Sequence, residues 1–116
     1  MTTINYDGRT FRSVSNTPNG EVTGETLFRY AQDGNIVTGV YSGGAVLQGT
    51  LIATVNQDGV LDMRYAHVNA AGELMTGVCR SVPELLEDGR IRLHETWRWT
   101  CSDEGAGSSI VEEVAE

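Results

Sequence analysis

One acidic side chain interrupts an apolar row that carries both tryptophans of the chain. Over residues 90–100, alternate positions place Leu93, Glu95, Trp97 and Trp99 on one face of a predicted β-strand. A carboxyl group in such a row must bind a partner, reach water or take up a proton. Desolvation would raise its pKa, as a general acid or base requires. Glu95 is therefore the strongest candidate for a ligand contact or for acid–base chemistry.

Glu95, Trp97 and Trp99 also allow structural interpretations. Glu95 could pair with an arginine or a tyrosine hydroxyl and so hold the strand in register. The two tryptophans could wall a small-molecule pocket, or they could be the largest parts of the core. In the opposite register they would face outward and belong to a subunit interface.

Three further residues are candidates for the same site. Tyr65 and His67 share a face with Leu61 and Met63 in the predicted strand 60–68. His67, at the end of that row, could reach an open mouth and titrate near neutral pH, or could simply be hydrogen-bonded. Tyr41 is an additional lumen candidate, with an ordinary strand aromatic as its alternative. The predicted ligand-binding set is Trp97, Trp99, Glu95, Tyr65, His67 and Tyr41.

Catalytic and metal-binding motifs are absent from the sequence. It contains no Gly-x-Ser-x-Gly, His-Glu-x-x-His, Cys-x-x-Cys or Walker string. Its two histidines lie on rows that face opposite ways, so we expect neither a metal nor a cofactor. The absence of lysine excludes Schiff-base chemistry.

The two cysteines are expected to be free thiols. A turn near Asp88-Gly89 would place Cys79 opposite about Arg98, and a longer loop would move it toward Leu93. Neither register brings Cys79 to Cys101.

Short β-strands must position these residues. Four Asp-Gly pairs, the first at 7–8 and the last at 88–89, predict type I′ hairpin turns, with Asn19-Gly20 a near equivalent. In one strand Leu47, Gly49 and Leu51 are predicted to share the inner face. The predicted strands are 10–15, 25–32, 35–42, 46–56, 60–68, 73–81, 90–100 and 108–114, and residues 83–87 could form one helical turn.

Eight strands in an open sheet would leave two unpaired edges, which invite aggregation. A closed up-and-down barrel removes both edges, and its interior can be filled by side chains or hold one small ligand. A two-sheet sandwich is the alternative, but consecutive short hairpins favour the barrel. We therefore predict an all-β, antiparallel up-and-down meander of about eight strands that closes into a small barrel, as a single domain over residues 1–116.

Charge and hydropathy limit the partners of the chain. A net charge of −8 argues against nucleic acid, which needs a basic patch. No apolar run approaches the ~20 residues that span a bilayer, so no membrane partner is expected. The first residues show no secretory signal, which predicts a cytoplasmic protein.

Several strings resemble a family of small bacterial proteins grouped as avidin-like and often labelled N-acetylglutamate synthase. They are Tyr41-Ser42-Gly43-Gly44, Asp62-Met63-Arg64-Tyr65, Gly72-Glu73-Leu74-Met75-Thr76-Gly77 and Leu93-His94-Glu95-Thr96-Trp97-Arg98-Trp99-Thr100. The resemblance covers about residues 11–114 and implies the avidin type of barrel within the wider calycin group. The label implies an acetyltransferase, but the sequence has neither the acetyl-CoA loop at a helix start nor the βα alternation that would carry it.

Three functions follow as expectations. The first is a barrel that binds a small molecule at one mouth. The second is a cofactor-free isomerase, cyclase or hydrolase that uses Glu95 as acid or base. The third is a structural or oligomerisation module with a filled core. A homodimer or homotetramer is expected because small barrels commonly expose apolar strand positions.

Overall fold

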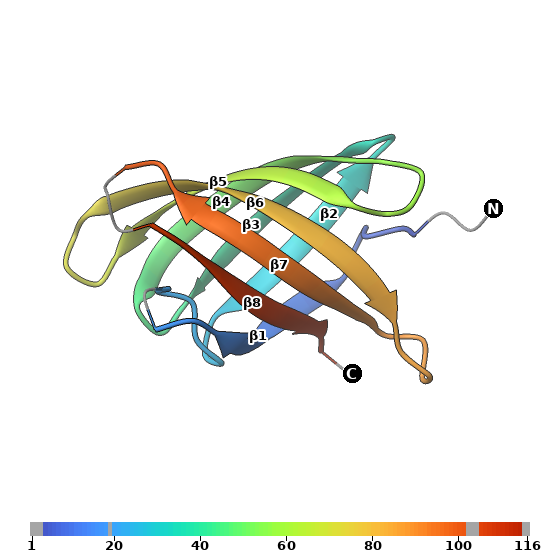
Figure 1. Ribbon diagram of the computed structural model, residues 1–116, viewed down its shortest axis with the longest axis horizontal. Coiled ribbons are helices and arrows are strands. Elements are labelled where there is room, and N and C mark those ends of the chain that lie inside the picture. The colour runs from blue at the N-terminus through green and yellow to red at the C-terminus, as the bar shows by residue number, and fades with distance from the viewer. Residues whose placement is uncertain (1–3, 19, 102–104, 115–116) are drawn as a thin grey trace.

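The barrel is closed by its first and last strands. The computed structural model describes residues 4–18, 20–101 and 105–114. Each strand pairs antiparallel with the next, and β1 pairs with β8, so the predicted meander and its closure are confirmed (Figure 1). The strands are β1 (Thr10–Asn16), β2 (Leu27–Asp33), β3 (Ile36–Gly43), β4 (Val46–Val55), β5 (Leu61–Asn69), β6 (Leu74–Leu85), β7 (Ile91–Trp99) and β8 (Ala106–Glu113).

The alternation in β7 places its apolar row inside the barrel. Leu93, Trp97 and Trp99 are buried, whereas His94 and Arg98 between them are exposed. The row that carries both tryptophans therefore faces the interior of the barrel. The alternative in which both indoles face outward is excluded. The same alternation in β5 buries Met63 and His67.

A bulge at the start of β4 overturns one predicted inner position. The register of β4 against β5 shifts between Val46 and Gln48, so Val46 is buried and Leu47 is 59% exposed. The prediction that Leu47 faces inward was wrong, because one extra residue on a strand reverses the facing of every position before it. Gly49 and Leu51, beyond the bulge, face inward as predicted.

The hairpin turns differ from the predicted type I′. The amide of Asn56 donates to the carbonyl of Val60, and the amide of Leu86 donates to the carbonyl of Arg90, so three residues form each loop. The last loop residue is Gly59 or Gly89, each with a positive φ angle, and no described residue other than glycine has one. Type I′ requires two successive residues with positive φ, whereas these loops require only the glycine. The pair Asn19-Gly20 lies partly outside the described residues.

Strand β6 continues through the segment that we expected to form a helical turn. Pro83 pairs with Leu93 of β7, and the strand ends at Leu85. The ladder between β5 and β6 begins at Leu61 and Ser81. Pro83 lies beyond this pair, so β6 forms no ladder bond to β5 there, and the missing N–H group of the proline removes none. Cys79 lies opposite Trp97, one residue from the position near Arg98 that a turn at Asp88-Gly89 predicts, and the register toward Leu93 was wrong. Cys79 and Cys101 are free thiols.

Tyr6 packs into the end of the barrel at the turn between β4 and β5. Its side chain is fully buried, its hydroxyl donates to the carbonyl of Gly59 at 2.5 Å, and its ring packs against Phe11 and Tyr30. The segment between β1 and β2 and the β5–β6 turn lie together at the opposite end, where Glu21 and Asn69 are hydrogen-bonded. In the described part of the chain no helix is long and apolar enough to cross a membrane.

Candidate ligand-binding site

A cavity of about 50 Å³ lies inside the barrel, and all six predicted site residues line it. Four lining residues remain partly exposed, namely Gly20, Val22, Tyr65 and Glu95. A cavity of this size holds a few water molecules or a group of a few non-hydrogen atoms. The lumen is therefore neither fully filled nor wide. The residues that complete the lining are Phe28, Tyr30, Leu51, Met63, Cys79 and Ser109.

Glycines on neighbouring strands make room for the aromatic rings of the site. Tyr41 pairs with Gly49 across the β3–β4 ladder, and Tyr65 pairs with Gly77 across the β5–β6 ladder. In both pairs a Cβ atom on the glycine would overlap the tyrosine ring. The tyrosine rings therefore pack directly against the backbone of these glycines. Glycine inside a strand often marks such a close approach. Trp97 lies against Gly107 of β8 in the same way.

The carboxyl group of Glu95 is held by two serine hydroxyls. Glu95 pairs with Ser81 on β6 and with Ser109 on β8. Ser81 Oγ donates to Oε2 at 2.8 Å, and Ser109 Oγ donates to Oε1 at 3.0 Å. The partners expected from the sequence, an arginine or a tyrosine hydroxyl, were therefore wrong. The reason is geometric, because the residues directly opposite a strand position are its nearest neighbours.

Burial controls the protonation of the groups around Glu95. It raises the pKa of Glu95 above that of an exposed carboxyl, and the hydrogen bonds from Ser81 and Ser109 oppose this in part. Burial likewise raises the pKa of the Cys79 thiol, and the nearby Glu95 carboxylate adds to that effect. The pKa values of Tyr41 and Tyr65 are raised for the same leading reason. These three groups are neutral at physiological pH.

His67 is hydrogen-bonded through both ring nitrogens and is buried. Nδ1 lies 2.9 Å from the Tyr41 hydroxyl, and Nε2 lies 2.7 Å from Oε1 of Glu21. The second oxygen of Glu21 accepts a hydrogen bond from the Asn69 side chain at 2.9 Å. Of the two alternatives for His67, the hydrogen-bonded side chain is confirmed and the exposed one at an open mouth was wrong, because Glu21 from the segment between β1 and β2 covers the ring.

Sequence reasoning missed Glu21, Ser81 and Ser109. The two serines lie on predicted strands, and the inward row of each strand could have indicated them once β7 was placed between β6 and β8. Glu21 carries no comparable signal, because it lies in a loop and meets β5 only when the barrel is closed.

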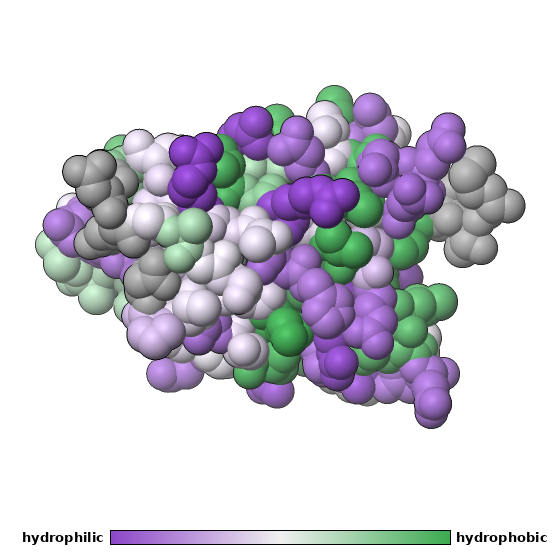
Figure 2. Space-filling view, in the orientation of Figure 1, coloured by the Kyte–Doolittle hydropathy of each residue, from purple (hydrophilic) through white to green (hydrophobic). Residues whose placement is uncertain are grey.

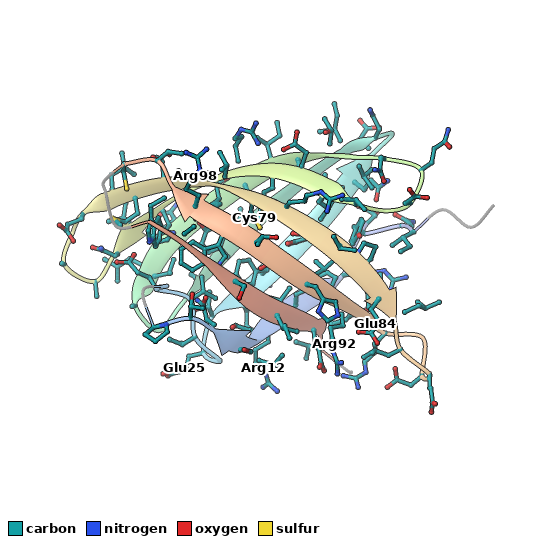
Figure 3. The ribbon with its side chains drawn as sticks, viewed as in Figure 1. Arg12, Glu25, Cys79, Glu84, Arg92 and Arg98 are labelled. Atoms are coloured by element: carbon teal, nitrogen blue, oxygen red, sulfur yellow. The ribbon has the colours of Figure 1, made fainter. Side chains whose placement is uncertain are left out.

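The outer surface of the barrel and its lumen differ in the charged side chains that they carry. Cys79 lies inside the barrel, whereas Glu84 and Arg92 lie at the outer surface of β6 and β7, 3.6 Å apart at their closest charged atoms (Figure 3). On the face that Figure 2 shows, hydrophobic residues are scattered among hydrophilic ones. Among the described residues no group of three or more His, Cys, Asp and Glu side chains could hold a metal ion.

These features define a small antiparallel β-barrel with an aromatic cavity that is closed at one end. The family model for avidin-like protein matches residues 4–114, and the chain belongs to that family. No curated protein and no solved structure matches the chain.

Proposed function

We propose that the protein binds a small molecule, or one end of it, inside the barrel. The observation that carries the proposal is the cavity of about 50 Å³, in which aromatic rings surround a single carboxyl group. Apolar walls with one or two polar groups to orient the ligand are typical of small-molecule sites. The barrel fold and the avidin-like family are consistent with this function.

The ligand would enter past the segment that carries Glu21. Val22 and Gly20 of this segment line the cavity, as does the partly exposed Tyr65. Trp97 and Trp99 would form the walls of the site, and Glu95 would orient the ligand from the interior. Tyr41 and His67 would line the cavity beside Glu21. Since the volume is small, most of a larger ligand would remain outside the barrel.

A screen of metabolites by thermal shift and tryptophan fluorescence tests this function. A true ligand raises the melting temperature of the wild-type protein and changes the emission of Trp97 and Trp99, the only tryptophans of the chain. A Trp97→Phe variant should lose part of the fluorescence response. If compounds of every charge class and size leave both signals unchanged, the proposal fails.

Acid–base catalysis is the second candidate. The raised pKa of Glu95, within a cavity, favours it, because a carboxyl group with a raised pKa keeps its proton to a higher pH and can act as a general acid. We rank it below binding because both oxygens of Glu95 already accept hydrogen bonds from serines. With a converted substrate in hand, Glu95→Gln should abolish turnover while binding survives.

We also infer that copies of the chain assemble through the outer face of β3 and β4. Val40 and Ile52 are 57% and 56% exposed, and they are diagonal neighbours in the β3–β4 ladder. Ile36 and Leu47 extend this apolar face along the same two strands. A second copy would cover the face, as symmetric interfaces commonly do.

A further inference from the structure

The lumen contains the carboxyl group of Glu95 but no arginine that could neutralise it. All eight basic residues of the chain are arginines, none of them is buried, and none lines the cavity. The contacts of Glu95 are instead the neutral hydroxyls of Ser81 and Ser109 and the neutral thiol of Cys79. The two carboxylate oxygens have four lone pairs together, so these three donors leave one for a further donor.

The other titratable groups of the cavity supply no excess positive charge. His67 lines it too, but the Glu21 carboxylate lies 2.7 Å from its Nε2, so the pair is neutral when His67 is protonated and negative when it is not. The remaining titratable groups are neutral phenols and a thiol, whose ionisation would add negative charge only. The electrostatic environment of the lumen is therefore neutral or negative.

Aromatic rings surround the position that a partner of Glu95 would occupy. Trp97 and Trp99 meet edge to face with ring centroids 5.4 Å apart, and Trp99 meets Tyr65 in the same manner at 5.9 Å. All three rings line the cavity together with Glu95. A cation at this position would be attracted by the charge of the carboxylate and also by the negative faces of the aromatic rings.

We propose that the group bound in the lumen is a small organic cation, a guanidinium, amidinium or alkylammonium head group, with Glu95 as its counter-ion and the indoles as its walls. This inference rests on the proposed function and names the ligand class. The cavity admits a group of a few non-hydrogen atoms, which matches such a head group. A longer substituent would leave the barrel past Val22 and Tyr65.

Three planar probes of nearly equal size test the charge preference directly. Guanidinium is positive, urea is neutral and acetate is negative, so they differ mainly in charge. Each is titrated into the full chain at constant ionic strength with sodium chloride, and tryptophan fluorescence and NMR spectra follow binding. For ligands this small we expect saturation by guanidinium in the millimolar range. Methylammonium is the second cationic probe.

The variants separate a specific site from general salt effects. Glu95→Gln should weaken guanidinium binding at least about thirtyfold, the lower limit expected when one partner of a buried charge pair is removed. Glu25→Gln removes an exposed acid from the segment between β1 and β2 and should leave the affinity unchanged. Unfolding curves of both variants show whether each is folded under the conditions of the titration.

The affinity for guanidinium should also rise with pH and level off above the pKa of Glu95, because only the carboxylate pairs with the cation. The same profile measured in Glu95→Gln gives the part of the pH dependence that does not come from Glu95. The titratable groups that face Glu95 from the other strands are Tyr30 on β2, Tyr41 on β3, Tyr65 on β5 and Cys79 on β6. All four have raised pKa values and stay neutral over this range.

Each result decides between the two proposals. Saturable binding of guanidinium or methylammonium that depends on Glu95, with urea and acetate inactive, supports the cationic ligand. Binding of urea or acetate in preference to the cations overturns this inference and leaves the small-molecule function standing. Equal guanidinium affinities of the wild type and Glu95→Gln also overturn it. If neither these probes nor any compound of the wider screen binds, both proposals fail.

Discussion

The carboxylate of Glu21 lies 2.7 Å from Nε2 of His67, although the two residues are 46 positions apart in the chain. Its other oxygen accepts a hydrogen bond from Asn69, two residues beyond His67 on β5. Glu21 thereby attaches the segment between β1 and β2 to the mouth of the barrel. The backbone carbonyl of Val22 is held as well, by the side chain of Asn16 at 3.0 Å.

Replacing Glu21 with glutamine should loosen this attachment. The amide can accept from His67, but its NH2 group would face the NH2 group of Asn69, so one bond is lost. We expect a loss of about 1 to 2 kcal/mol in the free energy of unfolding, measured by urea denaturation. Amide hydrogen exchange should accelerate in residues 20–26. The matched control is Glu25→Gln on the same segment, and equal stabilities of the two variants would contradict the prediction.

Replacing Gly49 with alanine should displace the Tyr41 ring. The new methyl group would overlap the ring, and the ring must then move away from His67, whose Nδ1 it holds at 2.9 Å. Overpacking of this kind costs about 1 to 3 kcal/mol. The control is Gly24→Ala, where the nearest atom to the added Cβ is the carbonyl oxygen of Ser13 at 3.6 Å. Thermal unfolding compares the two, and an undisturbed His67 resonance in the Gly49 variant would refute the displacement.

Replacing Glu95 with glutamine should change the pH dependence of stability. The folded-state pKa of Glu95 is raised above the ordinary value near 4.3 of an unfolded chain. Its contribution to stability is therefore complete below the unfolded pKa and is lost as the pH rises through the folded pKa. Glutamine stays neutral, and serine hydroxyls can donate or accept, so Ser81 and Ser109 keep their bonds to it.

The Glu95→Gln variant should thus gain stability relative to the wild type as the pH rises from 4 to 8. The gain is about 1.4 kcal/mol for each unit by which the pKa is raised. Urea denaturation at a series of pH values measures it, with Glu25→Gln as the exposed control. A difference between variant and wild type that stays constant over this range would show that Glu95 titrates as it does in an unfolded chain.

Charges on the outer face of β3 and β4 should dissociate an assembly. We expect the wild type to be a dimer or tetramer in size-exclusion chromatography with light scattering. The double variant Val40→Glu, Ile52→Glu should be monomeric, because both side chains are more than half exposed on this face. Leu85→Glu changes an equally exposed apolar residue at the end of β6 and should leave the assembly intact. A monomeric wild type would refute the interface.

The alternation of residues along the chain determined the strands, their inner faces and thereby the six residues around the cavity. This information is local, since successive side chains of a strand point to opposite faces whatever the strand pairs with. Glu95, Trp97 and Trp99 could be placed together for that reason. Three Asp-Gly pairs, at 33–34, 58–59 and 88–89, likewise marked hairpins, although not the type of turn, whereas Asp7-Gly8 lies before β1 and joins no two strands.

Tertiary structure alone decided what these residues meet. The bulge that turns Leu47 outward depends on how β4 aligns with β5, and the serine partners of Glu95 depend on which residues of β6 and β8 lie opposite it. Tyr6 and Glu21 lie outside the strands, and their side chains contact Gly59 and His67, 53 and 46 positions away in the chain. Such contacts join residues far apart in the chain, and no local pattern of residue types records them.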